Sequence, residues 1–123
     1  MILHASGEDY LEAVLILHNQ KGMVRSIDLA QHMGFSKPSI CHAVGVLRKG
    51  GFLTMDEDGF LHLTDIGQEV AETIYERHRF FRDRLLAVGV DRETAEHEAC
   101  QMEHTVSQES FEKIRDAHRE SKE

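Results

Sequence analysis

The chain has 123 residues, of which 41% are apolar and 29% are charged, and its formal net charge is −8 at pH 7. The apolar content excludes a disordered chain and suffices for one compact unit or two small subdomains that share a core. The chain has a single proline, which favours helix. No apolar run reaches membrane-spanning length and residues 1–7 lack a signal-peptide core, so a cytoplasmic protein is expected.

The first half of the chain carries the signals of three helices. Ser6 is expected to cap the first of them, and Asp9, three residues on, completes a capping box. Gly34 ends the second helix, and Pro38 falls in the first turn of the third, where its missing N–H costs nothing. The predicted helices run from Ser6 to about Asn19, from Ser26 to Met33 and from Ser36 to Gly50.

A hairpin and three more helices are predicted next. Two short β-prone runs flank Asp58-Gly59, a dipeptide typical of tight hairpin turns. The later helices are predicted from Thr64 to about Val88, from Asp91 to about Thr105 and from Ser107 onward, each with its first residue as the cap. A domain boundary is therefore expected where the hairpin meets the long helix, dividing the chain into residues 1–63 and 64–123.

Helix, helix-turn-helix and a two-stranded hairpin follow one another in the order of a winged helix. Ile40, Val44 and Leu47 line one face of the third helix, as packing in such a unit requires. The predicted fold is mainly α: an N-terminal winged helix-turn-helix with a small two-stranded wing, followed by an all-helical dimerisation domain. Such trihelical units also serve as protein-interaction modules, which is the alternative interpretation of this half.

Local charge favours DNA as the partner of the winged helix. Between Lys21 and Gly50 the chain carries five basic residues and one acid, a local net charge of +4, so the remainder carries −12. DNA contact depends on the local field more than on the total charge. A basic segment in an acidic chain is therefore compatible with DNA binding.

Two groups of polar residues have the spacing of metal ligands. Asp9 and Glu12 lie one turn apart on the first helix, so their carboxylates share a face. Cys100, Glu103 and His104 stand at i, i+3 and i+4, which also puts a thiol, a carboxylate and an imidazole on one helical face. Such a face packs poorly but resembles a first coordination shell.

His78 is a third candidate, because it falls in a helical row of apolar residues and needs a polar partner there. The row is Ile66, Val70, Ile74, Phe81 and Leu85. Taken one by one, the candidates also have structural interpretations: His78 as a core histidine, Asp9 as a capping acid, Glu12 as a surface charge and Cys100 as a small apolar residue. The two cysteines cannot form a disulfide framework, and Cys41 is expected to be a buried thiol.

Five segments carry a resemblance to a known family. The most specific is Glu-Ala-Cys-Gln-Met-Glu-His at 98–104; the others are Glu-Asp-Tyr-Leu-Glu at 8–12, Ser-Lys-Pro-Ser-Ile at 36–40, Leu-Thr-Asp-Ile-Gly at 63–67 and Arg-His-Arg at 77–79. Through them the chain resembles the diphtheria toxin repressor family of iron- and manganese-dependent regulators over essentially its whole length. The resemblance is to the short form, near the manganese transport regulator branch, without the third, SH3-like domain.

The resemblance implies a divalent metal site. The family's ligand positions correspond to Asp9, Glu12, His78, Cys100, Glu103 and His104. The two carboxylates on the first helix match the manganese-responsive branch, whereas the thiol matches the iron-responsive branch. The expected cofactor is therefore Mn²⁺ or Fe²⁺, with Zn²⁺ or Co²⁺ able to bind in vitro, and no organic cofactor is expected. Arg82 and Glu96 stand where iron-responsive members have ancillary ligands, so that second site is not expected in its usual form.

Resemblance and position point to one DNA-contacting surface near the start of the third helix. Its candidates are Arg25, Ser36, Lys37, Pro38, Ser39 and His42. Ser39 and His42 are expected to contact bases, because the first residues of a recognition helix reach base edges. Ser36, Lys37 and Arg25 are better suited to phosphate.

The predicted function is a metal-dependent DNA-binding transcriptional repressor, not an enzyme, that controls metal homeostasis and is activated by divalent Mn or Fe. It would bind double-stranded palindromic operator DNA as a homodimer, with recognition helices roughly 34 Å apart, and no membrane is expected as a partner. A bound cation would neutralise acids from both halves and fix the winged helix relative to the dimer. The alternatives are a winged-helix regulator not gated by metal and a small metallohydrolase, which is disfavoured because no substrate cleft or separate base is evident.

Overall fold

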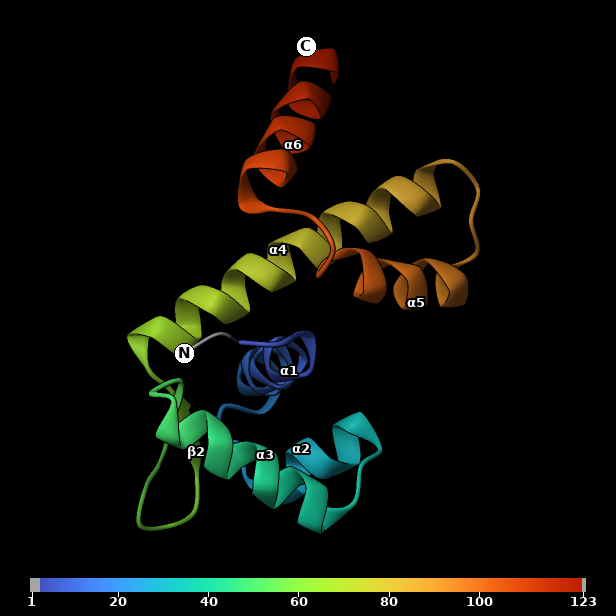
Figure 1. Cartoon of the computed structure of the whole chain (residues 1–123). Helices are drawn as coiled ribbons and strands as arrows, with labels where there is room; N and C mark the ends of the chain where they lie inside the picture. Colours follow the sequence, from blue (N-terminus) through green and yellow to red (C-terminus); the bar gives the residue numbers. More distant parts are fainter. Residues whose placement is uncertain (1–2, 123) are drawn as a thin grey trace. The chain divides into compact units, whose positions relative to one another are not determined.

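The computed structural model describes residues 3–122 of the chain (Figure 1). In this part the elements are, in chain order, α1 (Ala5–Lys21), α2 (Ser26–Met33), α3 (Lys37–Lys49), β1 (Leu53–Met55), β2 (Leu61–Leu63), α4 (Asp65–Ala87), α5 (Arg92–Met102) and α6 (Gln108–Lys122). The predicted mainly α fold with a small two-stranded wing is confirmed. The chain forms two compact units, Met1–Thr73 and Ile74–Glu123, which divide within α4.

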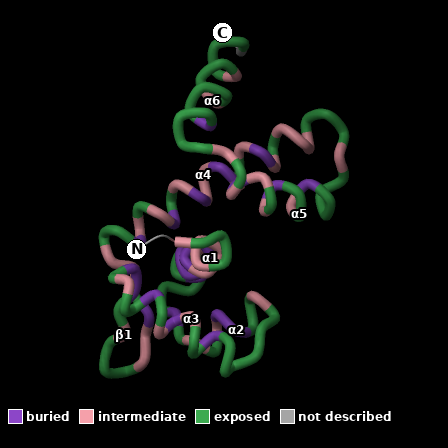
Figure 2. Tube along the Cα trace, in the orientation of Figure 1, coloured by how far each residue is buried: buried purple, intermediate pink, exposed green. Residues whose placement is uncertain are grey.

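Helices α1, α2 and α3, the wing and the start of α4 form the first unit. Gly34 joins α2 to α3 with φ at 71°, in the left-handed region where glycine carries no steric penalty. The predicted apolar face of α3 is buried, and Figure 2 shows buried positions alternating with exposed ones along these helices. The core of this unit includes Leu11, Val14, Leu15, Leu17, Val24, Leu29, Ile40, Val44, Leu47, Phe52, Leu53 and Leu61.

Four of the predicted helix caps are confirmed. In each, a side-chain oxygen accepts the backbone N–H three residues on, which satisfies a donor at the helix end. The pairs and their N···O distances are Ser36 with Ser39 at 3.3 Å, Thr64 with Gly67 at 3.1 Å, Asp91 with Thr94 at 3.1 Å and Ser107 with Ser110 at 3.1 Å. The contact with Thr94 lowers the pKa of Asp91 below its ordinary value.

The cap predicted for α1 is wrong. The helix begins at Ala5, and His4, in an extended conformation, occupies the N-cap position without a side-chain cap bond. The backbone N–H of Glu8 donates to the carbonyl of His4 at 3.1 Å, so helical hydrogen bonding starts earlier than the polar residues suggest. Ser6 therefore lies inside the first turn, and Asp9 is not at the third helical position that a capping box uses.

The wing is a short antiparallel hairpin, with Leu53 opposite Leu63, Thr54 opposite His62 and Met55 opposite Leu61. Its turn is organised by Asp56, whose carboxylate accepts the backbone N–H groups of Asp58 at 3.0 Å and Phe60 at 2.9 Å. Gly59 takes a φ of 85°, which the predicted Asp-Gly turn requires. Nε2 of His62 lies 2.9 Å from the Asp56 carboxylate, and this contact is the main reason that the pKa of Asp56 is lowered.

The second unit packs α5 and α6 against the C-terminal part of α4. Its core contains Phe81, Ala99 and Phe111, with Phe80, Met102 and Val106 packed against them. The predicted burial of the apolar row on α4 holds for Ile74 and Phe81 but is wrong for Ile66, which is 58% exposed. Gly67, not Ile66, faces the wing at that turn, so the isoleucine is directed to solvent. No helix among residues 3–122 is long and apolar enough to cross a membrane.

Candidate metal centre and DNA-binding surface

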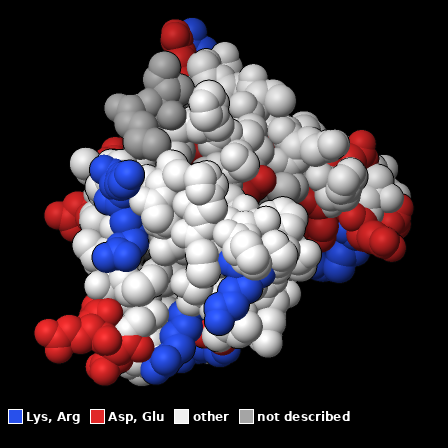
Figure 3. Space-filling model, turned by 60° about the horizontal axis from the view of Figure 1, so that its bottom comes forward, with Lys and Arg blue, Asp and Glu red and all other residues white. Residues whose placement is uncertain are grey.

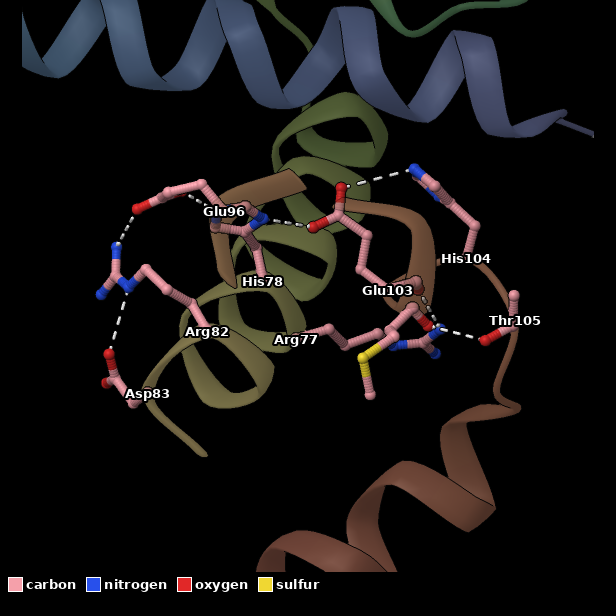
Figure 4. A network of polar contacts seen from close by, with 9 residues as sticks. Arg77, His78, Arg82, Asp83, Glu96, Glu103, His104 and Thr105 are labelled. Carbon is pink, nitrogen blue, oxygen red and sulfur yellow. Dashed lines mark hydrogen bonds and ion pairs between the residues drawn. The ribbon is translucent and has the colours of Figure 1, made fainter. Parts of the chain in front are cut away.

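His78, Glu103 and His104 form a connected polar cluster in the second unit (Figure 4). Nδ1 of His78, on α4, lies 2.9 Å from Oε2 of Glu103, and Nε2 of His104 lies 3.3 Å from Oε1 of the same carboxylate. The Glu103 side chain is 0% exposed, and those of His78 and His104 are 12% and 11% exposed. Two imidazoles thus converge on one fully buried carboxylate.

Cys100 brings a sulfur donor to the same cluster. Ligand atoms of Cys100, Glu103 and His104 all lie within 4.8 Å of one another. Glu103 is the C-cap of α5 and keeps a helical conformation, with φ at −62° and ψ at −19°. The i, i+3 and i+4 spacing therefore acts as it would inside a helix, and thiol, carboxylate and imidazole face one point.

Arg77 fixes the segment that carries Glu103. Its guanidinium, buried between α4 and the α5–α6 connection, donates to the backbone carbonyls of Glu103 at 3.1 Å and Val106 at 2.8 Å. A further hydrogen bond of 2.9 Å goes to the side chain of Gln108. Sequence reasoning used Arg77 only as part of a family match and missed this supporting contact, since the partners stand 26 to 31 residues away.

Glu96 is a second residue that sequence reasoning did not place in the cluster. Its Oε2 lies 2.7 Å from Nε2 of His78, and its Oε1 lies 3.6 Å from Arg82 Nη1. Glu96 stands four residues before Cys100 on α5, and that spacing was the available signal. Arg82 and Glu96, the two residues for which the sequence predicts no ancillary metal site of the usual form, are thus paired with each other.

Asp9 and Glu12 lie on α1, in the first unit. They are one turn apart, so the shared helix face predicted from their spacing is present. Glu12 is buried and Asp9 is partly buried, which rules out an ordinary solvated surface position for Glu12. With Glu103, these two carboxylates supply the hard oxygen donors among the six predicted ligands.

The donor chemistry of these residues fits a divalent cation. The second unit offers two imidazoles, a buried carboxylate and a thiol, and α1 offers two further carboxylates. Carboxylates suit Mn²⁺, whereas imidazole and thiolate suit Fe²⁺, Co²⁺ and Zn²⁺. A carboxylate withdrawn from water is costly unless hydrogen bonds or positive charge compensate, so the environment of Glu103 favours a cation.

The start of α3 presents the predicted DNA-contacting residues to solvent. Ser36, Lys37, Pro38, Ser39 and His42 are all exposed. The expectation that Cys41 is buried is wrong, because this thiol is exposed. Ile40 and Val44 occupy the buried positions of the helix, and Cys41, next to Ile40, is rotated away from the core.

Arg25 lies beside the wing, immediately before α2. Its guanidinium stacks 4.3 Å from the ring centroid of Phe60, and the two residues form an isolated backbone bridge. The wing tip itself is acidic, with Asp56, Glu57 and Asp58 exposed. Figure 3 shows Lys and Arg groups on the face turned to the viewer and an acidic group at its lower left. Of these surfaces, the basic side chains and not the acidic wing tip have the charge that suits phosphate.

Sequence profiles of two domains match the chain. Residues 2–61 match "Iron dependent repressor, N-terminal DNA binding domain". Residues 64–122 match "Iron dependent repressor, metal binding and dimerisation domain". The two matches follow one another in the predicted order, DNA binding first and then metal binding with dimerisation.

Curated relatives with similar sequences are transcriptional regulators. The chain is 35% identical over 104 residues to the transcriptional regulator MntR of Salmonella typhimurium, an alignment that covers 85% of this chain and 66% of that protein. It is 30% identical over 111 residues to the HTH-type transcriptional regulator MntR of Lysinibacillus sphaericus, covering 90% of this chain and 80% of the relative.

Solved structures with a similar fold include proteins described as manganese regulators or solved with a bound metal. The manganese regulator SloR superposes with a TM-score of 0.77 at 26% identity, covering 89% of this chain and 53% of the other. ScaR with bound Zn²⁺ gives a TM-score of 0.74 at 28% identity, covering 90% and 52%. The chain thus spans just under two thirds of the Salmonella regulator and about half of these two solved chains.

Proposed function

The chain belongs to the iron-dependent repressor family, and on this premise we propose that it is a metal-dependent transcriptional repressor that controls metal homeostasis. The observation that carries the proposal is the convergence of Cys100, Glu103 and His104 with His78 in the second unit. A winged helix alone would suit a regulator that does not respond to metal. A buried cluster of imidazole, carboxylate and thiol donors has no comparable role in packing and favours a response to metal.

We assign six residues to holding the cation: Asp9, Glu12, His78, Cys100, Glu103 and His104. Bound there, a divalent cation supplies positive charge that offsets the buried carboxylate charge. Asp9 and Glu12 belong to the DNA-binding half and the other four to the helical half. Ligands drawn from both halves make DNA affinity depend on metal, which is the coupling that a repressor of this kind needs.

We assign DNA contact to the exposed start of α3 and to Arg25. Ser39 and His42 lie where a recognition helix reaches base edges, so they contact bases. Lys37 and Arg25 contact phosphates through charge, and Ser36 does so through its hydroxyl group. Pro38 shapes the first helical turn and brings its ring close to the DNA backbone.

We further propose that the protein acts in the cytoplasm as a homodimer on palindromic operator DNA. A two-fold dimer presents two copies of α3, and these enter successive major grooves when they lie roughly 34 Å apart. A palindromic operator follows from the same two-fold symmetry. The activating ion is Mn²⁺ or Fe²⁺, and the protein regulates transcription without catalysing a reaction.

The test compares DNA affinity with and without metal. Operator duplexes are first selected from random DNA with the Mn²⁺-loaded chain, and affinity is then measured by fluorescence anisotropy with Mn²⁺, with anaerobic Fe²⁺ or with a chelator. Wild type should bind about 5- to 150-fold more tightly with metal, the range of typical coupling free energies. His104→Ala should lose this stimulation, because it removes a ligand.

His97→Ala is the matched control, since His97 is an exposed histidine on the same helix, α5. It should keep the full stimulation by metal. Equal stimulation in wild type and in both variants would contradict the proposed ligand set. DNA binding that ignores metal altogether would favour the regulator not gated by metal, and metal-dependent turnover of a chromogenic ester would favour a hydrolase.

A further inference from the structure

The imidazole of His78 lies between two carboxylates. Its Nδ1 is 2.9 Å from Oε2 of Glu103, and its Nε2 is 2.7 Å from Oε2 of Glu96 (Figure 4). The three side chains come from α4, from α5 and from the end of α5, so the packing of two helices sets this arrangement. The two carboxylates differ in burial, since the side chain of Glu103 is 0% exposed and that of Glu96 is 39% exposed.

The carboxylate oxygen of Glu96 that does not contact His78 is paired with two arginines. Its Oε1 lies 3.6 Å from Nη1 of Arg82 and 3.5 Å from Nη1 of Arg92. Arg82 is itself oriented by Asp83, with Nε of Arg82 at 3.1 Å from the Asp83 carboxylate. The two guanidinium groups beside Glu96 repel a cation there. On the other side of the ring, ligand atoms of Cys100, Glu103 and His104 lie within 4.8 Å of one another and offer a cation several donors. The cation is therefore directed to the Glu103 side of the ring.

An imidazole that binds a metal uses one nitrogen as the ligand and carries its hydrogen on the other. A carboxylate only accepts hydrogen bonds, so the nitrogen beside a carboxylate that stays in place keeps its hydrogen. Glu103 is a proposed ligand of the ion, whereas Glu96 is held by arginines. Nε2 therefore keeps the hydrogen, and the lone pair is at Nδ1.

We propose that Glu96, held by Arg82 and Arg92, is a positioning residue that fixes the ring of His78 so that Nδ1 meets the metal. This inference rests on the proposed function, because it presumes that His78 binds the ion. Glu96 acts through the ring and does not itself bind the cation. Its counterpart in many metal sites is the carboxylate that orients a ligating histidine and raises its basicity.

The first test asks which nitrogen of His78 carries the hydrogen when metal is bound. Zn²⁺ or ¹¹³Cd²⁺ is added to the ¹⁵N-labelled full chain, and long-range ¹H–¹⁵N correlation spectra report the state of each ring nitrogen. We expect a protonated Nε2 and a metal-bound Nδ1, with ¹¹³Cd–¹⁵N coupling to Nδ1. Coupling to Nε2 would overturn the inference.

The second test measures metal affinity by competition with a chelating dye. Glu96→Ala should weaken metal binding about 10- to 100-fold, the usual effect of losing such an orienting partner. Glu98→Ala is the matched control, because Glu98 is an exposed glutamate on the same helix, and it should stay within about 2-fold of wild type. Equal affinities for the two variants would overturn the inference.

Glu96→Gln separates a positioning role from a ligand role. An amide oxygen can still accept the hydrogen on Nε2, so this variant should bind metal more tightly than Glu96→Ala and keep the wild-type tautomer. Affinity as low as that of Glu96→Ala, with loss of the tautomer, would contradict positioning by hydrogen bonding. Thermal unfolding of each variant confirms that it is folded.

Failure of this inference is distinguishable from failure of the proposed function. Metal that binds through Nε2 of His78 and still tightens DNA binding would overturn only the role of Glu96. A chain that binds neither Zn²⁺, Cd²⁺ nor Mn²⁺, with DNA affinity unaffected by metal, would overturn both.

Discussion

Cys100 is the one sulfur donor in the described cluster, where it lies within 4.8 Å of ligand atoms of Glu103 and His104. Sulfur is a soft ligand and the carboxylates on α1 are hard ligands, so the six proposed residues form a mixed set. A change at this single position should therefore alter which metal is preferred more than whether a metal binds.

Cys100→Glu should shift the preference toward Mn²⁺, because it makes the proposed ligand set entirely oxygen and nitrogen. Competition titrations of both forms with Mn²⁺ and Fe²⁺ under anaerobic conditions measure the ratio of affinities. Cys41→Ser is the control, since it removes the exposed thiol on α3 and should leave the ratio as in wild type. An unchanged ratio in Cys100→Glu would refute the role of the sulfur.

At the scale of elements, α4 approaches the wing through Gly67. A side chain at this position would overlap the backbone carbonyl oxygen of Phe52, and backbone cannot move aside as a flexible side chain can. The backbone N–H of Thr64 also donates to that carbonyl at 3.1 Å, so the start of α4 and the base of the wing are tied together. The start of α4 can therefore pack this closely against the base of the wing only because residue 67 has no Cβ.

Gly67→Ala should destabilise the protein by about 1–3 kcal/mol through overpacking, despite the higher helix propensity of alanine. Gly45→Ala is the matched control, because Gly45 lies in α3 with open space around its Cβ position. That change should be neutral or stabilise by up to about 1 kcal/mol. Urea unfolding of the two variants measures both effects, and destabilisation of equal size in each would contradict the close contact.

The wing has a pH dependence of its own. The contact with His62, followed by the backbone N–H of Phe60, lowers the pKa of Asp56 below its ordinary value. A lowered pKa stabilises the folded turn above the unfolded pKa of about 3.9, and that contribution is lost as pH falls through the folded pKa. The amide chemical shift of Phe60 should therefore titrate below pH 3.9, as measured by NMR.

His62→Asn should move this titration upward, toward the ordinary value for aspartate, because it removes the largest cause of the shift. Asp58 also lies in the turn, so Asp58→Asn is the control for a general loss of negative charge there. In Asp58→Asn, the midpoint of the Phe60 titration should stay at a clearly lower pH than in His62→Asn. Identical titrations in wild type and His62→Asn would show that the histidine has no effect on Asp56.

At the scale of the whole molecule, the proposed function requires the basic segment around α3 to attract DNA although the chain as a whole carries −8. Without metal, binding should be weak and confined to low salt, because phosphate attraction through Lys37 and Arg25 is screened by added ions. With metal, linkage requires that operator DNA tighten metal binding by the same factor by which metal tightens DNA binding.

This reciprocity should appear as a coupling free energy of about 1–3 kcal/mol in wild type, measured as Mn²⁺ affinity with and without operator DNA. Glu12→Ala should abolish it, because that carboxylate is the proposed contribution of the DNA-binding half. Glu57→Ala, at the exposed wing tip, removes the same charge from the same half and should keep the coupling. Coupling of equal size in both variants would show that Glu12 does not link metal to DNA.

The sequence by itself determined most of the helices and the hairpin, because their signals act between neighbouring residues. Periodic apolar residues on α3, the caps at Ser36 and Asp91, and the Asp-Gly turn all act within a few residues, and the sequence alone predicted them correctly. The same is true of Glu103 and His104, since their common face follows from helical spacing. Two local predictions failed: Ser6 as the cap of α1 and Cys41 as a buried residue. In each case several neighbouring residues could have filled the predicted role, and the packing of the helix decided which one did.

Tertiary structure alone decided how His78 is held. The sequence placed this histidine on α4 and implied that it needs a polar partner, but Glu96 and Glu103 stand 18 and 25 residues away. The packing of α5 against α4 determines which carboxylate meets which ring nitrogen, and Arg77 fixes the backbone of Glu103 across 26 residues. Spacing along a helix specifies which side chains share a face, whereas contacts between helices depend on how their faces meet, and no local pattern specifies that.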